Sequence, residues 1–357
     1  MGSALIKALK GNALFDTMNT ASEGTVNDIK NYIDSGSYVF NLVLSGDMFQ
    51  GYIGNKITAL AGDSGTGKTL AALAAANALL ATDKNAQVIY LDTESATDKE
   101  QIAALVCDPS RVEHELVNNI EKLSEMILFI CKTQKELPAK DKHQLLLVID
   151  SLGNLTTSKE MNDLTEGNDK VDMTKAKKLA AMFRAATVPL TEAGICTIFT
   201  NHVYDTQEMF SQKIMKGGKA LVYLASTIIQ FSKRKDKDAT GVIGNIIRCS
   251  AVKARKAKEN AVVSMYISYK NGLNRYYGLL ELSESCGMVK RVGNRYEFPD
   301  GQKLFLKEIL KDPKNCWTDA HLKTLNEKIK AKFNYGNSDD DTDFSGGDDS
   351  EEESDQN

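Results

Sequence analysis

The chain is poor in the patterns that mark metal centres, disulfide-stabilised domains and membrane spans. Its six cysteines and four histidines form no C-x-x-C pair and no mixed cluster, so the sequence predicts neither a zinc site nor a disulfide framework. We expect reduced, buried thiols in a cytoplasmic protein. No secretory signal is recognisable, and the longest near-apolar run, Leu70–Ala81, is too short to cross a bilayer. The cysteines are Cys107, Cys131, Cys196, Cys249, Cys286 and Cys316.

Acidic residues are distributed unevenly along the 357 residues. Residues 337–357 contain ten Asp and Glu and no Lys or Arg, which leaves 38 acids against 44 bases elsewhere. The body therefore carries a formal charge of about +6, although the whole chain carries −4. A basic body with an acidic tail is typical of a polyanion-binding protein that carries its own competitor, but a solubilising tail explains the split equally well. With few apolar residues and high charge density, the tail is expected to be disordered.

Continuous apolar segments alternate with helical segments between residues 57 and 200. This alternation predicts an α/β fold with a mostly parallel sheet covered by helices on both faces. An apolar content of 42% is sufficient for an ordinary core. The strand-like segments are Ile57–Ala61, Gln87–Leu91, Leu145–Ile149 and Ile195–Thr200, and the helical ones are Leu70–Ala81, Asp98–Leu105, Asn119–Lys135 and Met173–Ala193.

The two ends of the chain follow other patterns. Beyond Lys219, strands without intervening helices predict an antiparallel extension of the sheet: Ser226–Ser232, Val242–Val252 and Ala261–Tyr269. From Tyr276 the pattern becomes helical, over Tyr277–Val289, Lys303–Lys311 and Thr318–Phe333, with the single tryptophan, Trp317, among them. Helical spacing over Ala4–Phe15, followed by a polar stretch, predicts a separate N-terminal arm. We therefore divide the chain into an arm (1–35), a core (36–275), a small helical C-terminal unit (276–336) and the acidic tail (337–357).

The most specific motif is an uninterrupted G-x-x-x-x-G-K-[ST] pattern between a predicted strand and a predicted helix. Its glycines let backbone N–H groups turn toward an anion, and the helix N-terminus adds its positive dipole end. Lys68 can reach the β- and γ-phosphates of a nucleotide, and the Thr69 hydroxyl can hold Mg²⁺. The motif predicts nucleotide binding without saying what the nucleotide drives. Its residues are Gly62, Asp63, Ser64, Gly65, Thr66, Gly67, Lys68 and Thr69, and Leu70 continues the binding segment.

Polar residues also follow the other predicted parallel strands, where ligands of open α/β sheets bind. Asp150 ends an apolar strand, as the second Mg²⁺-associated residue of phosphate-loop NTPases does; a turn or capping aspartate is the alternative. Glu94 is the candidate to polarise the attacking water, with Asp92 as competitor. His202 can donate to a γ-phosphate, although a lone histidine at a strand end is more often structural.

A long segment after His202 combines glycines, cations and apolar side chains. This combination suits a loop that contacts phosphates and wedges between bases, and the alternative is an ordinary surface loop. Its distinctive residues are Tyr204, Met209, Phe210, Lys213, Met215, Lys216, Gly217, Gly218 and Lys219.

From about Phe40 to Leu280 the chain resembles the RecA recombinase superfamily, most closely the phage UvsX type. The phosphate-binding loop carries part of the resemblance. The other stretches are Tyr90-Leu91-Asp92-Thr93-Glu94, the segment from Val148 to Leu155, and the segment from Asn201 to Phe210. The last two are more specific than the loop, since nucleotide binding in general does not dictate them.

The resemblance implies residue roles. Glu94 becomes the catalytic carboxylate and His202 the γ-phosphate sensor, where bacterial relatives carry Gln. Segments 156–171 and 202–221 become the first and second DNA-binding loops, which adds Lys159 and Lys170 to the candidate DNA contacts. The arm becomes the polymerisation element, with Leu14 and Phe15 as its expected anchors.

Two further implications concern the nucleotide. Lys253 and Arg255 match the paired cations that reach ATP across a subunit interface, where such cations contribute roughly 10³-fold or more to hydrolysis in other NTPases. The alternative interpretation of Lys253 and Arg255 is a basic strand that faces solvent. The bacterial relatives also place an aromatic residue against adenine shortly after the catalytic glutamate, whereas residues 98–101 here include none.

These expectations describe a DNA-dependent ATPase that uses ATP and Mg²⁺, forms helical filaments on single-stranded DNA and exchanges strands with homologous duplex. Mediator and single-strand-binding proteins are possible partners, and the host cytoplasm is the expected location for a phage-encoded protein. Two alternatives remain: a hexameric DNA helicase of the same fold, and a non-catalytic, ATP-gated single-strand-binding protein.

Overall fold

A nine-stranded sheet forms the centre of the molecule in this computed structural model, which describes residues 4–10, 12, 14, 17–167, 174–205, 213–215, 224–239 and 241–335. The strand order is β13-β12-β11-β10-β3-β7-β6-β4-β5. The strands from β10 to β5 are parallel, and β11, β12 and β13 continue the sheet antiparallel. The predicted parallel core with an antiparallel extension is confirmed, but the strand predicted at Ser226–Ser232 belongs to the parallel part, because β10 pairs parallel with β3.

The parallel strands are short, apolar and buried, as their sequences predicted. They are β3 (Ile57–Gly62), β4 (Gln87–Asp92), β5 (Val112–Leu116), β6 (Leu145–Asp150), β7 (Cys196–Asn201) and the first half of β10 (Thr227–Asp238). The edge strand β5 is the exception: its residues are exposed except for a half-buried Val112, and three of the five are polar. The sequence pattern did not predict this strand.

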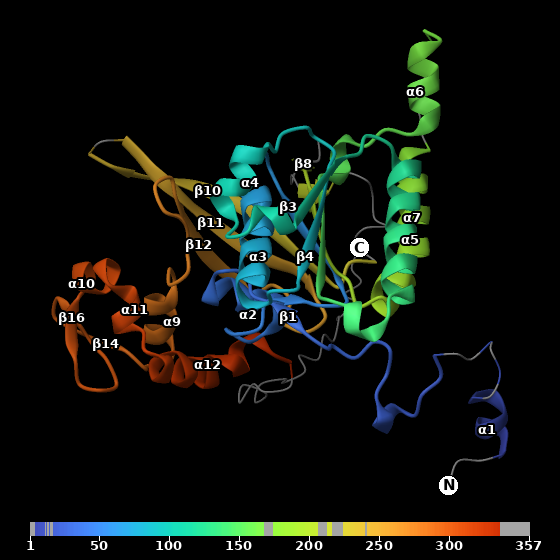
Figure 1. Cartoon of the computed structure of the whole chain (residues 1–357). Coiled ribbons are helices and arrows are strands. Elements are labelled where there is room, and N and C mark those ends of the chain that lie inside the picture. The colour runs from blue at the N-terminus through green and yellow to red at the C-terminus, as the bar shows by residue number, and fades with distance from the viewer. Residues whose placement is uncertain are drawn as a thin grey trace, which may run out of the picture.

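Helices cover both faces of the sheet (Figure 1). The first layer contains α2 (Tyr38–Ser45), α3 (Lys68–Thr82) and α4 (Lys99–Leu105), and the second contains α5 (Ile120–Glu136) and α7 (Lys175–Glu192). Each strand contributes to both layers because successive side chains point to opposite faces. In β3, Leu60 packs into the first cluster and Ala59 and Ala61 into the second.

The antiparallel extension is longer than predicted. β10 pairs along its whole length with β11 (Gly241–Ala254), so that the two strands project beyond the sheet as a hairpin (Figure 1). The charged stretch from Lys233 to Asp238 is largely exposed and breaks the apolar pattern, which is why the sequence predicted an earlier end. β12 (Val262–Ser268) and β13 (Gly272–Asn274) complete the edge.

The C-terminal unit contains strands as well as helices, which corrects the purely helical prediction. A three-stranded antiparallel sheet joins β14 (Lys290–Val292), β15 (Arg295–Glu297) and β16 (Lys303–Phe305). It packs with helices around Phe298 and Trp317, whose ring centroids lie 5.2 Å apart. The helices are α9 (Leu279–Ser285), α10 (Leu306–Lys311), α11 (Pro313–Cys316) and α12 (Asp319–Phe333).

The N-terminal helix α1 (Ala4–Lys10) lies away from the sheet (Figure 1) and is shorter than its apolar spacing predicted. Leu14 is exposed, whereas Phe15 and the acidic tail lie outside the described residues. Among the helices of the described ranges, none has the length and apolar character that a bilayer span requires. The other elements of the described ranges are β1 (Tyr32–Ile33), β2 (Tyr52–Ile53), α6 (Ser158–Thr165), β8 (Val203–Asp205), β9 (Lys213–Met215) and 3-10 turns at Ala21–Glu23, Pro109–Arg111, Ala139–Asp141 and Leu152–Asn154.

Candidate active site

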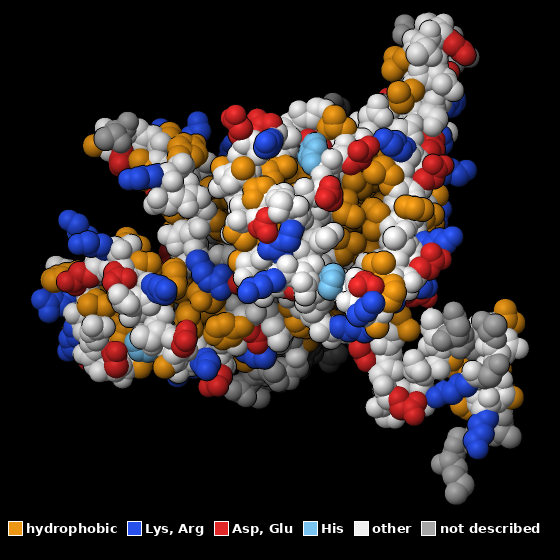
Figure 2. Space-filling view, viewed as in Figure 1, with side chains coloured by type: hydrophobic (Ala, Val, Ile, Leu, Met, Phe, Trp, Pro, Cys, Tyr) orange, Lys and Arg blue, Asp and Glu red, His pale blue; other side chains and the backbone are white. Residues whose placement is uncertain are grey.

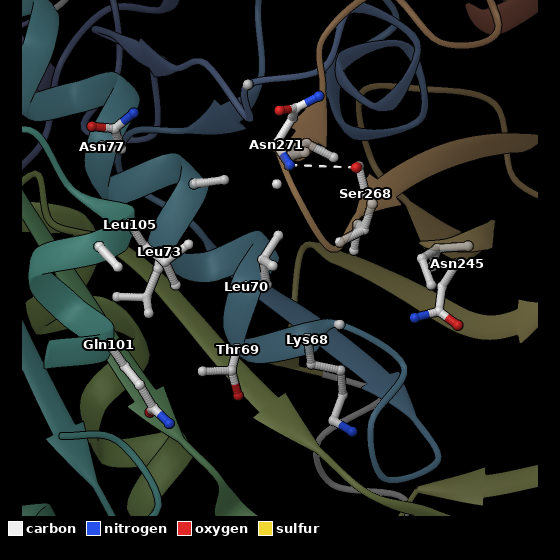
Figure 3. A pocket seen from close by; sticks show the side chains of 18 of the residues that line it. Lys68, Thr69, Leu70, Leu73, Asn77, Gln101, Leu105, Asn245, Ser268 and Asn271 are labelled. Atoms are coloured by element: carbon white, nitrogen blue, oxygen red, sulfur yellow. Dashed lines mark hydrogen bonds between the residues drawn. The ribbon is translucent and has the colours of Figure 1, made fainter. Parts of the chain in front are cut away.

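A cavity of about 1150 Å³ opens at the carboxyl ends of the parallel strands. Its walls are the phosphate-binding loop, one side of α3, one side of α4 and the β12–β13 turn (Figure 3). Lys68, Thr69, Glu94, Asp150 and His202 all line it. The structure therefore brings together five site residues that the sequence predicted from four separate strand ends.

The phosphate-binding loop has the backbone that its glycines predicted. Gly65 and Gly67 have φ angles of +67° and +88°, and a Cβ at Gly62 would lie 2.7 Å from the carbonyl oxygen of Phe231. Gly67 caps α3, so the N-terminus of a 15-residue helix faces the cavity. The Thr66 hydroxyl donates to the carbonyl of Asp63 (2.9 Å) and closes the loop.

The ammonium of Lys68 donates to the carbonyl oxygens of Gly62 (3.0 Å) and Asp63 (2.9 Å). Burial lowers the pKa of Lys68, while the nearby carboxylates of Asp150 and Glu94 act in the opposite direction. The lysine is thus held beside the glycine-rich backbone by acceptors that phosphate oxygens can replace.

Asp150 is surrounded by hydroxyl groups. Its Oδ2 accepts from Thr69 (2.6 Å) and from the phenol of Tyr90 (2.7 Å), and its Oδ1 accepts from Thr200. One hydroxyl and one carboxylate at this position fit Mg²⁺, which takes most of its ligands from water and substrate phosphates. The described parts of the chain hold no cluster of three or more His, Cys, Asp or Glu suited to a metal.

Glu94 stands at the mouth of the site on a turn that Asp92 organises. Its Oε1 accepts from the Ser151 hydroxyl and lies 2.9 Å from Nε2 of His202. Burial alone would raise the pKa of Glu94, but these hydrogen bonds and the charge of Lys68 hold it below the usual value. Asp92 is instead almost fully buried beneath the turn, which favours Glu94 as the carboxylate that meets a substrate.

The predicted DNA-binding residues are only partly described. Tyr204 follows His202 on β8 and is exposed, and Lys159 lies on α6, which projects from the body (Figure 1). The backbone at Lys213 belongs to β9, which pairs with β8. Lys170, Phe210, Lys216, Gly217, Gly218 and Lys219 lie outside the described residues.

Lys253 and Arg255 do not reach the cavity of their own chain. In β11, Lys253 pairs with Ile228 near the start of β10, whereas the phosphate-binding loop lies beyond the pair Phe231–Gly62. Burial and the charge of Arg255 lower the pKa of Lys253, and the pKa of Lys56 is lowered by burial and by Arg255 and Lys256. These residues form a cationic cluster at the opposite end of the strands from the loop.

Several residues of the site were missed at the sequence level. Tyr90 and Thr200 bind Asp150, Ser151 binds Glu94, and Lys233 donates to the carbonyl of Gly65 (2.8 Å). Tyr90 and Thr200 lie within apolar strands and resemble core residues there. The position of Ser151, directly after Asp150 at a strand end, does predict a site residue, but no sequence signal predicts its bond to Glu94.

The base end of the cavity has no aromatic side chain at residues 98–101, as the sequence indicated. Gln101 and Leu105 of α4 lie there, with Leu105 facing Leu73 of α3 (Figure 3). On the opposite wall, Tyr269 lines the cavity and its hydroxyl accepts from the side chain of Asn245 (3.3 Å). An aliphatic floor with amide groups at its edges can accommodate a planar base.

Known proteins resemble this chain over most of its length. Residues 15–274 match the RecA N-terminal domain family. The "Recombination and repair protein" of Enterobacteria phage T4 is 31% identical over 260 residues, which are 72% of this chain and 64% of that protein. "Protein RecA" of Streptomyces rimosus is 27% identical over 289 residues (79% and 72%), and "Protein RecA" of Chloroherpeton thalassium 26% over 295 (80% and 79%).

The chain thus spans less than two thirds of the length of the T4 protein. The family match, in contrast, begins in the N-terminal arm and runs through the antiparallel edge of the sheet. It takes in every strand end around the cavity, and on this ground the chain belongs to the RecA family.

Proposed function

We propose that the protein is an ATP-dependent DNA recombinase that polymerises on single-stranded DNA and pairs it with homologous duplex. The observation that carries this proposal is the contact of 2.9 Å between His202 and Glu94. Glu94 borders the phosphate-binding loop, and His202 stands where the predicted second DNA-binding loop begins. One side chain therefore connects the hydrolytic carboxylate to the segment that would hold DNA.

Each residue of the cavity has a definite part in this proposal. Lys68 and the backbone N–H groups of the loop bind the triphosphate. Thr69 and Asp150 hold Mg²⁺, whose positive charge offsets that of the phosphates. Glu94, kept ionised by Ser151 and His202, orients water and accepts its proton. His202 exchanges its contact with Glu94 for one with the γ-phosphate and so reports the nucleotide to the loop.

The cationic cluster supports assembly from identical subunits. Because Lys253 and Arg255 lie away from their own cavity, they complete the cavity of a neighbour. A contact between two different surfaces of identical subunits repeats head to tail, which produces an open helix unless the rotation closes a ring.

A second pair of surfaces supports the same assembly. The edge strand β5 and α5 expose Leu116, Leu128 and Phe129, and Figure 2 shows hydrophobic side chains gathered over this part of the molecule. The N-terminal arm exposes Leu5 and Leu14. We place the arm of one subunit on this apolar area of the next, since exposed apolar patches mark protein contacts.

DNA contacts would come from Lys159, Tyr204 and the glycine-rich, cationic segment that follows. Phosphate contacts make affinity fall steeply with salt concentration, while aromatic residues stack on bases. We expect this activity in the cytoplasm, where ATP and single-stranded DNA are present, and in the host cytoplasm if the protein is phage-encoded. Mediator or single-strand-binding proteins would assist loading.

Two measurements separate this function from its alternatives. Electron microscopy with single-stranded DNA and a non-hydrolysable ATP analogue should reveal open helical filaments, whereas closed six-fold rings would indicate a helicase. ATP hydrolysis should rise on adding single-stranded DNA, and a lack of turnover would indicate a non-catalytic binding protein.

The coupling itself is tested by His202→Ala, with His143→Ala as the control because His143 is exposed and does not line the cavity. ATP should no longer raise the affinity of His202→Ala for single-stranded DNA. An unchanged response to ATP would refute the role of His202.

A further inference from the structure

The outer edge strand of the sheet contains a histidine, His114, whose ring contacts the neighbouring strand although the residue is exposed. β5 is the end strand of the sheet and pairs with β4, and His114 lies opposite Tyr90 in this pairing. The His114 ring stacks on the Tyr90 ring with 5.7 Å between centroids and 13° between planes. Its Nε2 lies 3.3 Å from Oδ2 of Asp92. His114 therefore makes two directed contacts with β4, although four of the five residues of β5, His114 among them, are exposed.

Asp92 links His114 to the turn that carries Glu94. Its Oδ1 accepts from the backbone N–H groups of Glu94 (2.8 Å) and Ser95 (2.9 Å), and its Oδ2 accepts from that of Thr97 (3.2 Å). Ser95 has a φ of +52°, a left-handed conformation that non-glycine residues adopt only with local support. The Asp92 carboxylate supplies that support and so fixes where Glu94 stands.

The stacking of His114 on Tyr90 connects the edge strand to Asp150, on the proposed Mg²⁺ side of the site. The Tyr90 hydroxyl donates to Asp150 (2.7 Å) and shares a hydrogen bond with Thr97 (3.1 Å). The ring of Tyr90 is fixed on one side by the His114 stack. The two groups that meet water and metal, Glu94 and Asp150, are thus both supported by neighbours that His114 touches.

We propose that His114 is a positioning residue for ATP hydrolysis, acting from the edge strand through Asp92 on Glu94 and through Tyr90 on Asp150. The inference rests on the hydrolytic role proposed for this cavity. His114 does not line the cavity, so it acts on the geometry of hydrolysis and not on nucleotide binding. Its essential groups are an N–H donor toward Asp92 and a flat face toward Tyr90.

Three variants of the full chain separate these groups. His114→Ala removes both, His114→Phe keeps the flat face, and His114→Gln keeps an N–H donor. The measurements are kcat and KM for ATP with single-stranded DNA, the Kd of a fluorescent ATP analogue, and the thermal unfolding temperature. His143→Ala is the matched control, because that histidine is exposed and distant in sequence from the site.

We expect His114→Ala to lower kcat by about 10- to 100-fold, the usual cost of a misplaced catalytic group. KM, Kd and the unfolding temperature should stay close to wild type. His114→Gln should recover much of the lost kcat, and His114→Phe should recover less. With Asp92→Asn, His114→Ala should have a smaller further effect than alone, because both changes act on one contact.

Wild-type kcat in His114→Ala would overturn the inference. So would equal losses in all three variants that follow the unfolding temperature, because that pattern describes a purely structural residue. An inactive wild-type protein would instead refute the proposed ATPase, so the two failures are distinguishable.

Discussion

Lys68 is bound to carbonyl oxygens of the loop that precedes it, at Gly62 and Asp63. Phosphate oxygens are stronger acceptors than carbonyls for an ammonium, since they carry negative charge and carbonyl oxygens are neutral. The lysine is therefore already close to its expected ligand and needs only to change partners. This arrangement favours a tight and early contact with the triphosphate.

Lys68→Ala should lose ATP-dependent DNA binding together with hydrolysis. Removing one such charge-stabilising donor lowers kcat by roughly 10²–10³-fold, and the filament loses the nucleotide that orders it. DNA binding measured by fluorescence anisotropy with and without ATP checks this, with the exposed Lys84→Ala as control. Filaments that ATP still stabilises in Lys68→Ala would contradict the expectation.

Glu94→Gln should bind ATP normally and hydrolyse it about 10²–10⁴-fold more slowly, the range for loss of a general base. The pKa of Glu94 is held below its ordinary value of 4.5. The carboxylate therefore remains charged above that pH, and its titration causes no loss of kcat between pH 5 and 8. Steady-state hydrolysis and nucleotide binding test the substitution. Glu100→Gln on α4, an exposed site, should behave as wild type.

Single residues differed in how well the sequence revealed them. Lys68, Thr69, Glu94, Asp150 and His202 were predictable because each stands in or directly after a motif at a strand end. The partners that orient them were not, because Tyr90 and Thr200 come from neighbouring strands and lie inside apolar segments. A tyrosine within such a strand is read as core unless the strand order is known.

At the scale of elements, α12 attaches the C-terminal unit to the core. The side chain of Lys330 donates to Asp47 (3.0 Å), and that of Asn326 accepts from the backbone of Met48 (2.9 Å). Leu322, Leu325 and other residues of α12 belong to the same apolar cluster as α2. The predicted boundary near residue 276 therefore separates two sequence patterns whose side chains share one core.

Asp47→Asn should weaken this attachment in a pH-dependent way. Burial alone would raise the pKa of Asp47, but hydrogen bonds from Phe49, Lys330 and Asn326 lower it below 3.8. The folded pKa lies below the unfolded one, so the stabilisation is present above pH 3.8 and disappears as the pH falls through the folded value. We expect a loss of about 1 kcal/mol in unfolding free energy at pH 7.

Thermal unfolding of both proteins between pH 3 and 7 measures this difference. The gap between wild type and Asp47→Asn should narrow steadily below pH 4, while the exposed Asp141→Asn serves as control. A gap of constant size over the whole range would show that the charge of Asp47 is irrelevant to the attachment.

Elements were predictable in proportion to their apolar content. The central parallel strands are continuous apolar runs and were found, with ends shifted by a residue or two. β5 was missed because an edge strand is solvated on one side and here reads Val-Glu-His-Glu-Leu. The strands β14, β15 and β16 have three residues each, too few to display a periodicity.

On the scale of the whole molecule, the two parts of the proposed hydrolytic site lie at opposite ends of the strands. One protein that lacks Glu94 and another that lacks Lys253 and Arg255 should each be inactive alone. In an equal mixture, about a quarter of head-to-tail junctions unite two intact parts. The mixture of Glu94→Gln with Lys253→Ala/Arg255→Ala should therefore regain up to about a quarter of wild-type hydrolysis. A mixture as inactive as its components would argue against cations that act in trans.

Removal of residues 337–357 should strengthen DNA binding, mainly at low salt. The truncation deletes ten acids and no base, which exposes the positive body to DNA phosphates, and salt screens this effect. Fluorescence anisotropy with duplex and single-stranded DNA, at about 50 and about 300 mM salt, measures this change in affinity. Unchanged affinity at both salt concentrations would leave the tail a role in solubility or partner docking.

The distance between the cationic cluster and its own cavity makes a row of subunits unequal at its ends. In the proposed filament, every interior subunit has its nucleotide covered by the next one, but the last subunit at one end has no such neighbour. The ATP of that terminal subunit would then stay intact while interior ATP turns over, so hydrolysis per subunit would rise with the length of the filament. Hydrolysis at the uncovered end would begin only when another subunit arrives.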